Sequence, residues 1–389
     1  MPHRLDVHPQ RLGDLVGVHV IAHRAPWRHE MLVYVNLYIC DIYVKYVPCL
    51  AGGHGRRPSG PERHGGGRRD NVVTLKKAYY NAAMGGRRLQ VADLTSLEVD
   101  SLSRETTLFV MTLSPMEVHG PHLPLGTDVW VAEEVRERAL EKIGRDHPEL
   151  DFALFPSYYL GSDTIAGSME VGSRAVYLVV LAAGAFLAAR GFHWLLVLDN
   201  HGGPRHQIAM AKAVRRLYQR DGFHVVAPFL SFYRRMVELD PLLLERLEAG
   251  PGACGDAQDC HAGSNETSLM LCAMPDKVRD EWKSLPRRSI NTRRWPSVLL
   301  GTLGRTASAL GWKELGNDLA YVGTMLSWVT EKNPPNYIGH PAAASPRAGE
   351  RMLDAFADEA LARTEAALRG EPPFHRPLGW SLRFLEPSR

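Results

Sequence analysis

Short apolar runs alternate with longer stretches of helical periodicity from residue 107 onward. Because these runs are mostly apolar rather than apolar at every second position only, they predict strands that are buried on both faces. Four strands are expected, at 107–113, 152–155, 194–198 and 223–227. The expected helices alternate with the strands and continue after them, at 129–145, 175–190, 205–221, 266–273 and 345–370. This order predicts an α/β fold, a three-layer α/β/α sandwich with a mostly parallel central sheet.

Residues 280–335 show no clear period and hold several Trp and Gly residues and two Arg pairs. We expect this segment to form an excursion over the mouth of a binding site. Together with residues 157–173, it is expected to line the pocket.

The first 83 residues differ from the rest in composition. They hold 12 basic against 6 acidic residues, seven of the 17 histidines and a Gly/Arg-rich patch at 52–69 that cannot form a core. They could be a metal-binding or nucleic-acid-binding tail, a disordered extension, or sequence upstream of a true start at Met84. We favour the last two, with 1–83 as an N-terminal extension and 84–375 as the folded domain. The apolar run Met31–Leu50 could form a short hairpin.

Composition excludes several classes of protein. The net charge of +3 comes from the first 83 residues, so a nucleic-acid surface on the main domain is not expected. The most apolar stretch, 175–189, is interrupted by Gly184 and is too short to span a bilayer, and the start of the chain lacks a secretory pattern. Membrane partners are therefore not expected. The five cysteines lack CxxC spacing, which favours a reduced, cytoplasmic setting.

Three polar clusters follow expected strands or open expected helices. They are Glu117–Asp128, Asp199–Gly203 and Asp259–Ser268. Since ligands bind at the carboxyl ends of strands in open parallel sheets, the clusters are expected to meet at one edge. Imidazole and carboxylate are ligands that divalent zinc or manganese accept.

In order and spacing, the motifs ExHGxHLPxGTD, NHGG and DxHAGxxETS resemble the creatininase family of metal-dependent amidohydrolases. The segment Asn336–Ser345 is similar to the family's C-terminal turn, and the resemblance covers roughly residues 88–370. It implies an α/β/α sandwich, assembly into homo-oligomers (often hexamers), and two divalent ions per chain. The ions are expected to be zinc, with manganese or iron as alternatives.

Carried over residue by residue, the resemblance implies a role for each candidate. Glu117 and His201 would bind one metal ion and His119 the other, and Asp128 would bridge both. His261 would be the acid/base for the leaving nitrogen. Glu266 would add a carboxylate ligand or activate the water. The family's second-site glutamate corresponds to Gly203 here, which weakens the case for creatinine as substrate.

Each candidate also has a simpler interpretation. Asp128 could be only the N-cap of the helix that follows it, and Glu266 could serve only its helix dipole. His201 could cap a backbone carbonyl, and His261 could orient a ligand instead of transferring a proton.

The predicted function is a hydrolase that cleaves a non-peptide C–N amide bond of a small molecule. The nucleophile would be a hydroxide shared by two ions ~3.5–4 Å apart. One alternative is a deformylase or small peptidase that acts on a biosynthetic intermediate. The other is a non-catalytic relative that keeps the fold.

Overall fold

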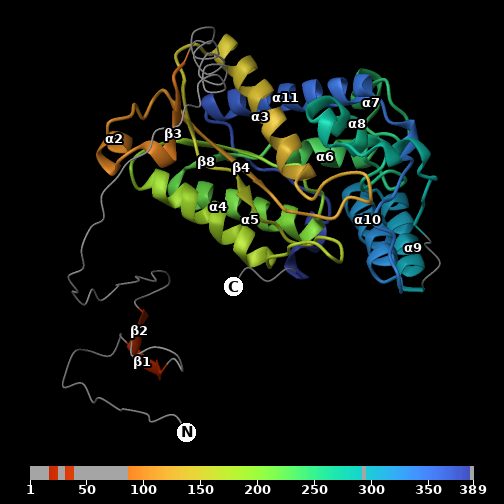
Figure 1. The fold of residues 1–389 in the computed structure, drawn as a ribbon, viewed down its shortest axis with the longest axis horizontal. Helices are drawn as coiled ribbons and strands as arrows, with labels where there is room; N and C mark the ends of the chain where they lie inside the picture. The colour runs from red at the N-terminus through yellow and green to blue at the C-terminus, as the bar shows by residue number, and fades with distance from the viewer. Residues whose placement is uncertain (1–16, 25–30, 39–85, 291–294, 386–389) are drawn as a thin grey trace, which may run out of the picture. The chain divides into compact units, whose positions relative to one another are not determined.

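The computed structural model describes residues 17–24, 31–38, 86–290 and 295–385. The chain divides into two units, Met1–Gly67 and Arg68–Arg389. In the first unit, β1 (Gly17–Arg24) pairs antiparallel with β2 (Met31–Tyr38) (Figure 1). The hairpin therefore consists of β2, which begins the predicted apolar run, and β1, which precedes that run. The rest of the predicted extension lies outside the described residues, so the boundary at Met84 stays a prediction.

The second unit is built on a parallel sheet. Its strands are β3 (Arg88–Gln90), β4 (Thr107–Ser114), β5 (Asp151–Leu154), β6 (Tyr158–Tyr159), β7 (Trp194–Leu198) and β8 (His224–Val226). Their order is β3-β5-β4-β7-β8, with β6 paired to the end of β4, and every pair is parallel. The four predicted strands are confirmed, whereas β3 and β6 are too short to leave a pattern.

Helices cover both faces of the sheet. On one face lie α3 (Thr127–Asp146) and α11 (Pro346–Leu368), and on the other lie α4 (Ser173–Ala188) and α5 (Pro204–Asp221) (Figure 1). Leu108 and Val110 of β4 pack in the core on the α3 side, while Phe109 and Met111 pack on the α4 side. Successive strand side chains point to opposite faces, so a wholly apolar strand needs both faces covered. The predicted three-layer sandwich is confirmed.

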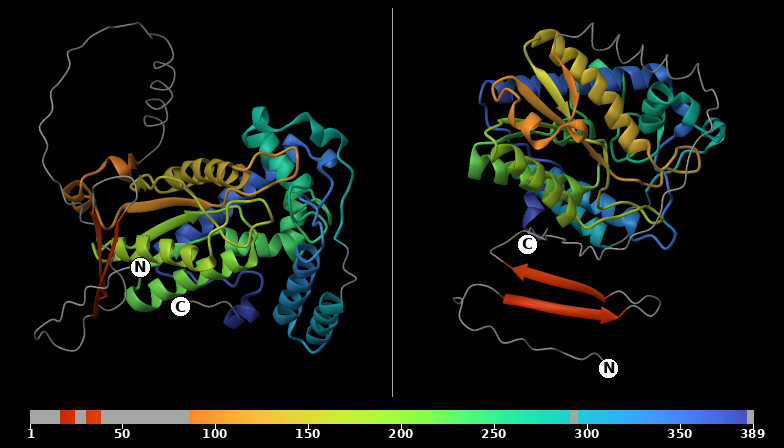
Figure 2. Two further views of the ribbon diagram at one scale, coloured as in Figure 1. Left: turned by 60° about the horizontal axis from the view of Figure 1, so that its bottom comes forward. Right: turned by 60° about the vertical axis from the view of Figure 1, so that its left-hand side comes forward.

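Further helices complete the unit around this sandwich. They are α2 (Ser96–Asp100), α6 (Phe229–Val237), α7 (Pro241–Leu247), α8 (Ser264–Ala273), α9 (Trp295–Ala309) and α10 (Lys313–Val329). The segment that the sequence could not assign contains α9 and α10, which lie side by side as a helical hairpin (Figure 2). None of the helices among the described residues is long and apolar enough to cross a membrane.

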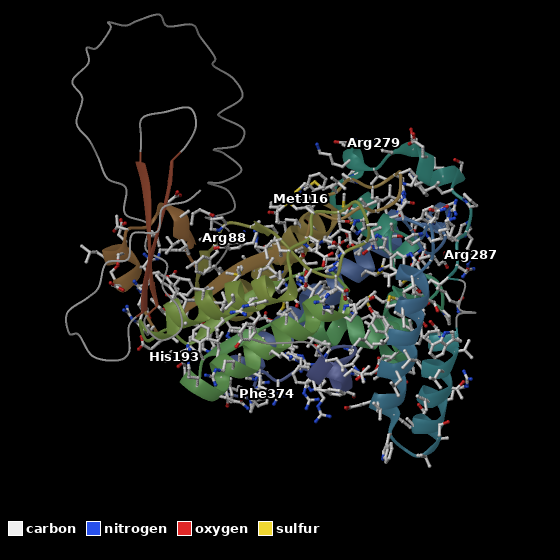
Figure 3. All side chains as sticks on the ribbon, turned by 90° about the horizontal axis from the view of Figure 1, so that it is seen from below. Arg88, Met116, His193, Arg279, Arg287 and Phe374 are labelled. Atoms are coloured by element: carbon white, nitrogen blue, oxygen red, sulfur yellow. The ribbon has the colours of Figure 1, made fainter. Side chains whose placement is uncertain are left out.

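Figure 3 shows the two ends of the unit. His193, which precedes β7, lies at the opposite end from Arg279 and Arg287, which follow α8. The polar clusters follow the carboxyl ends of β4 and β7 and therefore lie away from His193.

Candidate metal centre

The three polar clusters meet at one end of the sheet, as the sequence predicts. Glu117 and His119 follow β4, and Asp128 is the second residue of α3. His201 lies in the turn between β7 and α5, while His261 precedes α8 and Glu266 lies in its first turn. All six side chains are buried.

Glu117, Asp128 and His201 form a first group. His201 Nδ1 lies 3.0 Å from Glu117 Oε2 and 3.5 Å from Asp128 Oδ2. The opposite ring nitrogen, Nε2, donates to the carbonyl oxygen of Ser162 at 3.0 Å. Because a carbonyl can only accept, the proton of a neutral His201 is on Nε2 and the lone pair of Nδ1 faces the two carboxylates.

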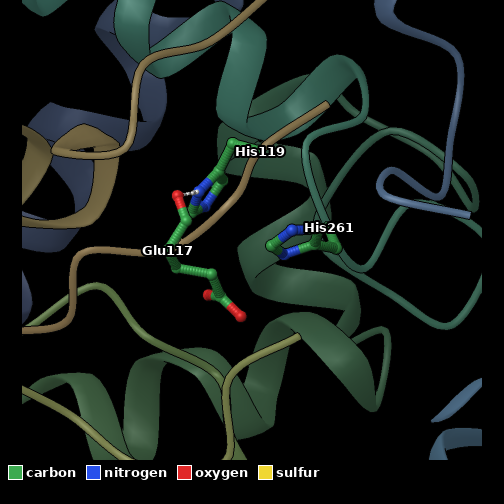
Figure 4. Close-up of side chains that lie close together, drawn as sticks. All are labelled: Glu117, His119 and His261. Carbon is green, nitrogen blue, oxygen red and sulfur yellow. Dashed lines mark hydrogen bonds between the residues drawn. The ribbon is translucent and has the colours of Figure 1, made fainter. Parts of the chain in front are cut away.

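His119, Asp128 and Glu266 form a second group, in which a histidine nitrogen again faces two carboxylates. His119 Nε2 lies 3.4 Å from Asp128 Oδ1 and 3.5 Å from Glu266 Oε2. His119 Nδ1 donates to the carbonyl oxygen of Glu117 at 2.9 Å (Figure 4). A neutral His119 therefore also directs a lone pair at two carboxylate oxygens. Asp128 belongs to both groups, with one oxygen toward each histidine.

His261 stands beside both groups. Its ring centroid is 4.4 Å from that of His119, and with Glu117 and His119 it forms a third set of closely spaced ligand atoms (Figure 4). His261 Nε2 donates to the carbonyl oxygen of Val118 at 2.7 Å. The next residue, Ala262, holds a left-handed φ of 48°, a conformation that non-glycine residues adopt at a cost and that occurs often at functional sites.

The mutual charges of these groups shift their pKa values. Burial alone would lower the pKa of His119, but Asp128 and Glu266 raise it well above its ordinary value. The pKa of His201 is raised in the same way against its burial by Glu117 and Asp128. Burial would raise the pKa of Glu117 and of Asp128, but the histidines lower both. The free site therefore holds ionised carboxylates beside protonated histidines.

The donor set fits metal ions. His119 Nε2 and Asp128 Oδ2 are buried and have no hydrogen-bond partner among the described residues. Unpaired buried polar atoms are costly, and one cation in each group, in place of the histidine protons, would satisfy them. The ligand atoms of each group lie within 4.8 Å of one another. Both groups could hold a divalent ion, with the Asp128 carboxylate between them.

Backbone groups orient the carboxylates and histidines, and no residue type marks these groups in the sequence. The Ile165 amide donates to Glu117 Oε1 at 2.8 Å, and the Ser162 carbonyl holds His201. Asn200 Nδ2 donates to Asp128 Oδ1 at 3.4 Å. Position 203 has no room for a side chain, because a Cβ there would lie 2.9 Å from the Asp163 carbonyl oxygen and closer still to His201 Nε2.

Two simpler interpretations can be weighed against these contacts. Gly126, not Asp128, is the N-cap of α3, so the N-cap interpretation of Asp128 is wrong. Glu266 does lie in the first turn of α8, but its Oε2 also accepts from the Ala262 amide and faces His119. The structure thus supplies the second group with a second carboxylate although position 203 is a glycine.

Two neighbouring residues hold the segments that bear these groups. His122 Nε2 lies 2.8 Å from Thr267 Oγ1, and burial lowers the pKa of His122 to about 4. Asp259 accepts from the backbone amides of Ser264 and Asn265, both at 2.7 Å, and burial raises its pKa to about 8.

A cavity of about 450 Å³ opens onto the centre. Residues 163–165 and residues of α10 between Tyr321 and Val329 line it. The prediction that segments 157–173 and 280–335 line the pocket is confirmed.

Comparison with known proteins identifies a family, two relatives and one solved structure. The family profile described as creatininase, creatinine amidohydrolase, matches residues 92–364. The chain is 29% identical over 186 residues to the mycofactocin precursor peptide peptidase of Mycolicibacterium smegmatis, covering 46% of this chain and 64%, less than two thirds, of that protein. It is 25% identical over 261 residues to the protein of the same name from Mycobacterium ulcerans, covering 65% of this chain and 83% of that protein. A solved mutant creatininase matches with a TM-score of 0.50 at 18% identity, over 72% of this chain and 99% of that chain, a likeness of fold alone.

Proposed function

Because the chain belongs to the creatininase family, we propose that it is a dinuclear metal-dependent hydrolase that cleaves an amide C–N bond. One observation carries the proposal. The Asp128 carboxylate is shared between two histidine–carboxylate groups, each with a ring nitrogen directed at two carboxylates. Such an arrangement suits a pair of cations, which would replace the histidine protons between the imidazole nitrogens and the carboxylates.

The residues that would hold the ions follow from the two groups. Glu117, Asp128 and His201 would hold the first ion, and His119, Asp128 and Glu266 the second. Bound there, the ions would polarise the amide carbonyl and lower the pKa of water to about 7, so that a nucleophile exists at neutral pH. Zinc, manganese and iron all accept such ligands, and zinc is our first expectation.

His261 is the proposed acid/base. The hydrogen bond from Nε2 to the Val118 carbonyl holds the proton of the neutral ring at Nε2. The atom that can take up a proton is therefore Nδ1. Nδ1 would accept the proton that the attacking water loses and pass it to the leaving nitrogen, since an amine leaves readily only when protonated.

The relatives bear on which amide is cleaved. Two of them are named as peptidases of a precursor peptide, and this favours a peptide bond in a short peptide. A non-peptide amide of a small molecule, our first expectation from the sequence, is the second candidate. Glu266 beside His119 and Asp128 speaks against a non-catalytic relative that has lost one ion. A homo-oligomer in the cytoplasm remains our expectation from the sequence.

Metal analysis and a substrate panel test the proposal together. We expect purified protein to bind about two divalent ions per chain, as two-metal hydrolases do. The loaded protein is then assayed on short peptides, formamides and cyclic amides, with His261→Gln as the inactive control. Protein that binds no ion under any loading condition, or that binds ions yet cleaves no amide of the panel, would refute it.

A further inference from the structure

The cavity beside the metal centre has a small polar part and a larger apolar part. Glu117, His201, His261 and Glu266 line the end at the centre. The rest of the lining is mostly apolar and comes largely from three helices, α6, α10 and α11, with Asp163, Asn200 and Arg205 among the polar exceptions. The side chains that matter here are Phe229 and Tyr233, Met325 and Trp328, and Met352 and Phe356. Aromatic and methionine side chains are typical walls for bulky apolar groups.

Hydrogen bonds within the protein already use the polar atoms of these walls. The Tyr321 hydroxyl donates to the Gly202 carbonyl oxygen at 3.0 Å, and the Tyr233 hydroxyl lies 3.4 Å from that of Tyr321. Trp328 Nε1 donates to the Pro335 carbonyl oxygen at 2.8 Å. A charged substrate group placed against these side chains would lose its water without gaining a partner from them, which is strongly unfavourable.

Packing fixes the walls in place before any ligand arrives. The ring of Phe229 lies 5.2 Å from that of Tyr233 and 5.4 Å from that of Phe356, measured between centroids. On α10, the buried Asp318 accepts from the backbone amides of Gly379 at 3.0 Å and Ser381 at 2.8 Å. The helix that forms one wall is therefore tied to the C-terminal segment, and the cavity is preformed.

We propose that this cavity is a specificity subsite for a bulky, uncharged, apolar group, preferably aromatic, that adjoins the scissile amide. The inference rests on the proposed function and adds the substrate class. The cavity volume of about 450 Å³ is within the usual range for small-ligand sites. The substrate is thus an amide or short peptide with an aromatic or large aliphatic side chain next to the bond that is cleaved.

Calorimetric binding to the metal-loaded full chain tests the subsite separately from catalysis. The probes are N-acetylphenylalaninamide, N-acetylglycinamide and N-acetyllysinamide, which share a backbone and differ in the side chain. We expect the phenylalanine compound to bind at least about 30-fold more tightly than the other two, since a single methylene in an apolar pocket is worth about 10- to 200-fold.

A matched pair of variants locates the binding. Met325→Glu places a charge in the α10 wall and should weaken binding of the phenylalanine compound at least about 10-fold, because the charge opposes the apolar ring. Leu303→Glu adds the same charge on α9, where Leu303 is 47% exposed and does not line the cavity, and should leave binding unchanged. Met325→Gln repeats the test without a charge should the glutamate variant fail to fold.

The outcomes separate the two proposals. Tight binding of the phenylalanine compound that depends on Met325, without cleavage of any amide, would keep the subsite and refute the hydrolase. Cleavage of glycine, lysine and phenylalanine substrates with equal kcat/KM would keep the hydrolase and refute the subsite. Equal loss of binding in the Met325 and Leu303 variants would also refute the subsite.

Discussion

Replacing Asp128 by asparagine should release both ions together. The two side chains have the same shape, but Asp128→Asn removes the one negative charge that the two groups share. In the structure, Asp128 Oδ1 lies 3.4 Å from His119 Nε2 and Asp128 Oδ2 lies 3.5 Å from His201 Nδ1. Each group therefore falls from two carboxylates to one.

The size of the effect follows from this charge. A pair of unit charges about 4 Å apart, at an effective dielectric constant of about 20, is worth about 4 kcal/mol, or about 1,000-fold in a binding constant. The double charge of each ion increases this attraction, whereas water that enters the altered site reduces it. We therefore expect both dissociation constants to rise by about 1,000-fold.

Elemental analysis after equilibration with buffered free zinc measures both ions. At a free concentration that saturates the unaltered protein, Asp128→Asn should retain almost no metal. Asp163→Asn is the matched control, since Asp163 lines the cavity but belongs to neither group, and asparagine tolerates its φ of 67°. A variant that keeps one ion at full affinity would show that Asp128 does not bridge.

Three further outcomes are expected. Gly203→Ala should displace His201 and reduce metal content, whereas Gly172→Ala, where a Cβ meets nothing within 4 Å, should not, as elemental analysis and thermal unfolding will show. Because carboxylates raise the pKa of His119 and His201, both are protonated in ion-free protein. Ion binding should therefore release protons and weaken as the pH falls. Calorimetry in buffers of different ionisation enthalpy measures the proton release, and a pH-independent affinity for the ions would contradict this prediction. Removal of the residues before Met84 should leave metal content and Tm unchanged, and an insoluble product would contradict this.

The sequence predicted the sheet well because its strands are apolar on both faces. A run such as 107–113, which alternates along the chain with helical segments, is typical of a strand between two helical layers. The helix α9 was missed for the opposite reason. Trp295, Val298, Leu299 and Leu303 are apolar but exposed, so the period that separates a buried from a solvent-facing side is blurred.

The candidate site likewise has a part that the sequence predicted and a part that it did not predict. His119 and Asp128 lie in a motif of acids, imidazoles and glycines, whose chemistry is visible in the residue types. The carbonyls of Ser162 and Val118, which fix the tautomers of His201 and His261, have no sequence signature because every residue carries one. Sequence reasoning can therefore name metal-binding side chains but not the backbone that orients them.

The distance along the chain between Glu117 and Glu266 has a thermodynamic consequence. The side chains that would bind the ions come from segments after β4, at the start of α3, after β7 and at α8, so an unfolded chain cannot present them together. Ions that bind only the folded state stabilise it by about 2.7 kcal/mol at a free concentration 100 times the dissociation constant. The supply of free metal would then control how much folded protein survives proteolysis as well as how fast each molecule works.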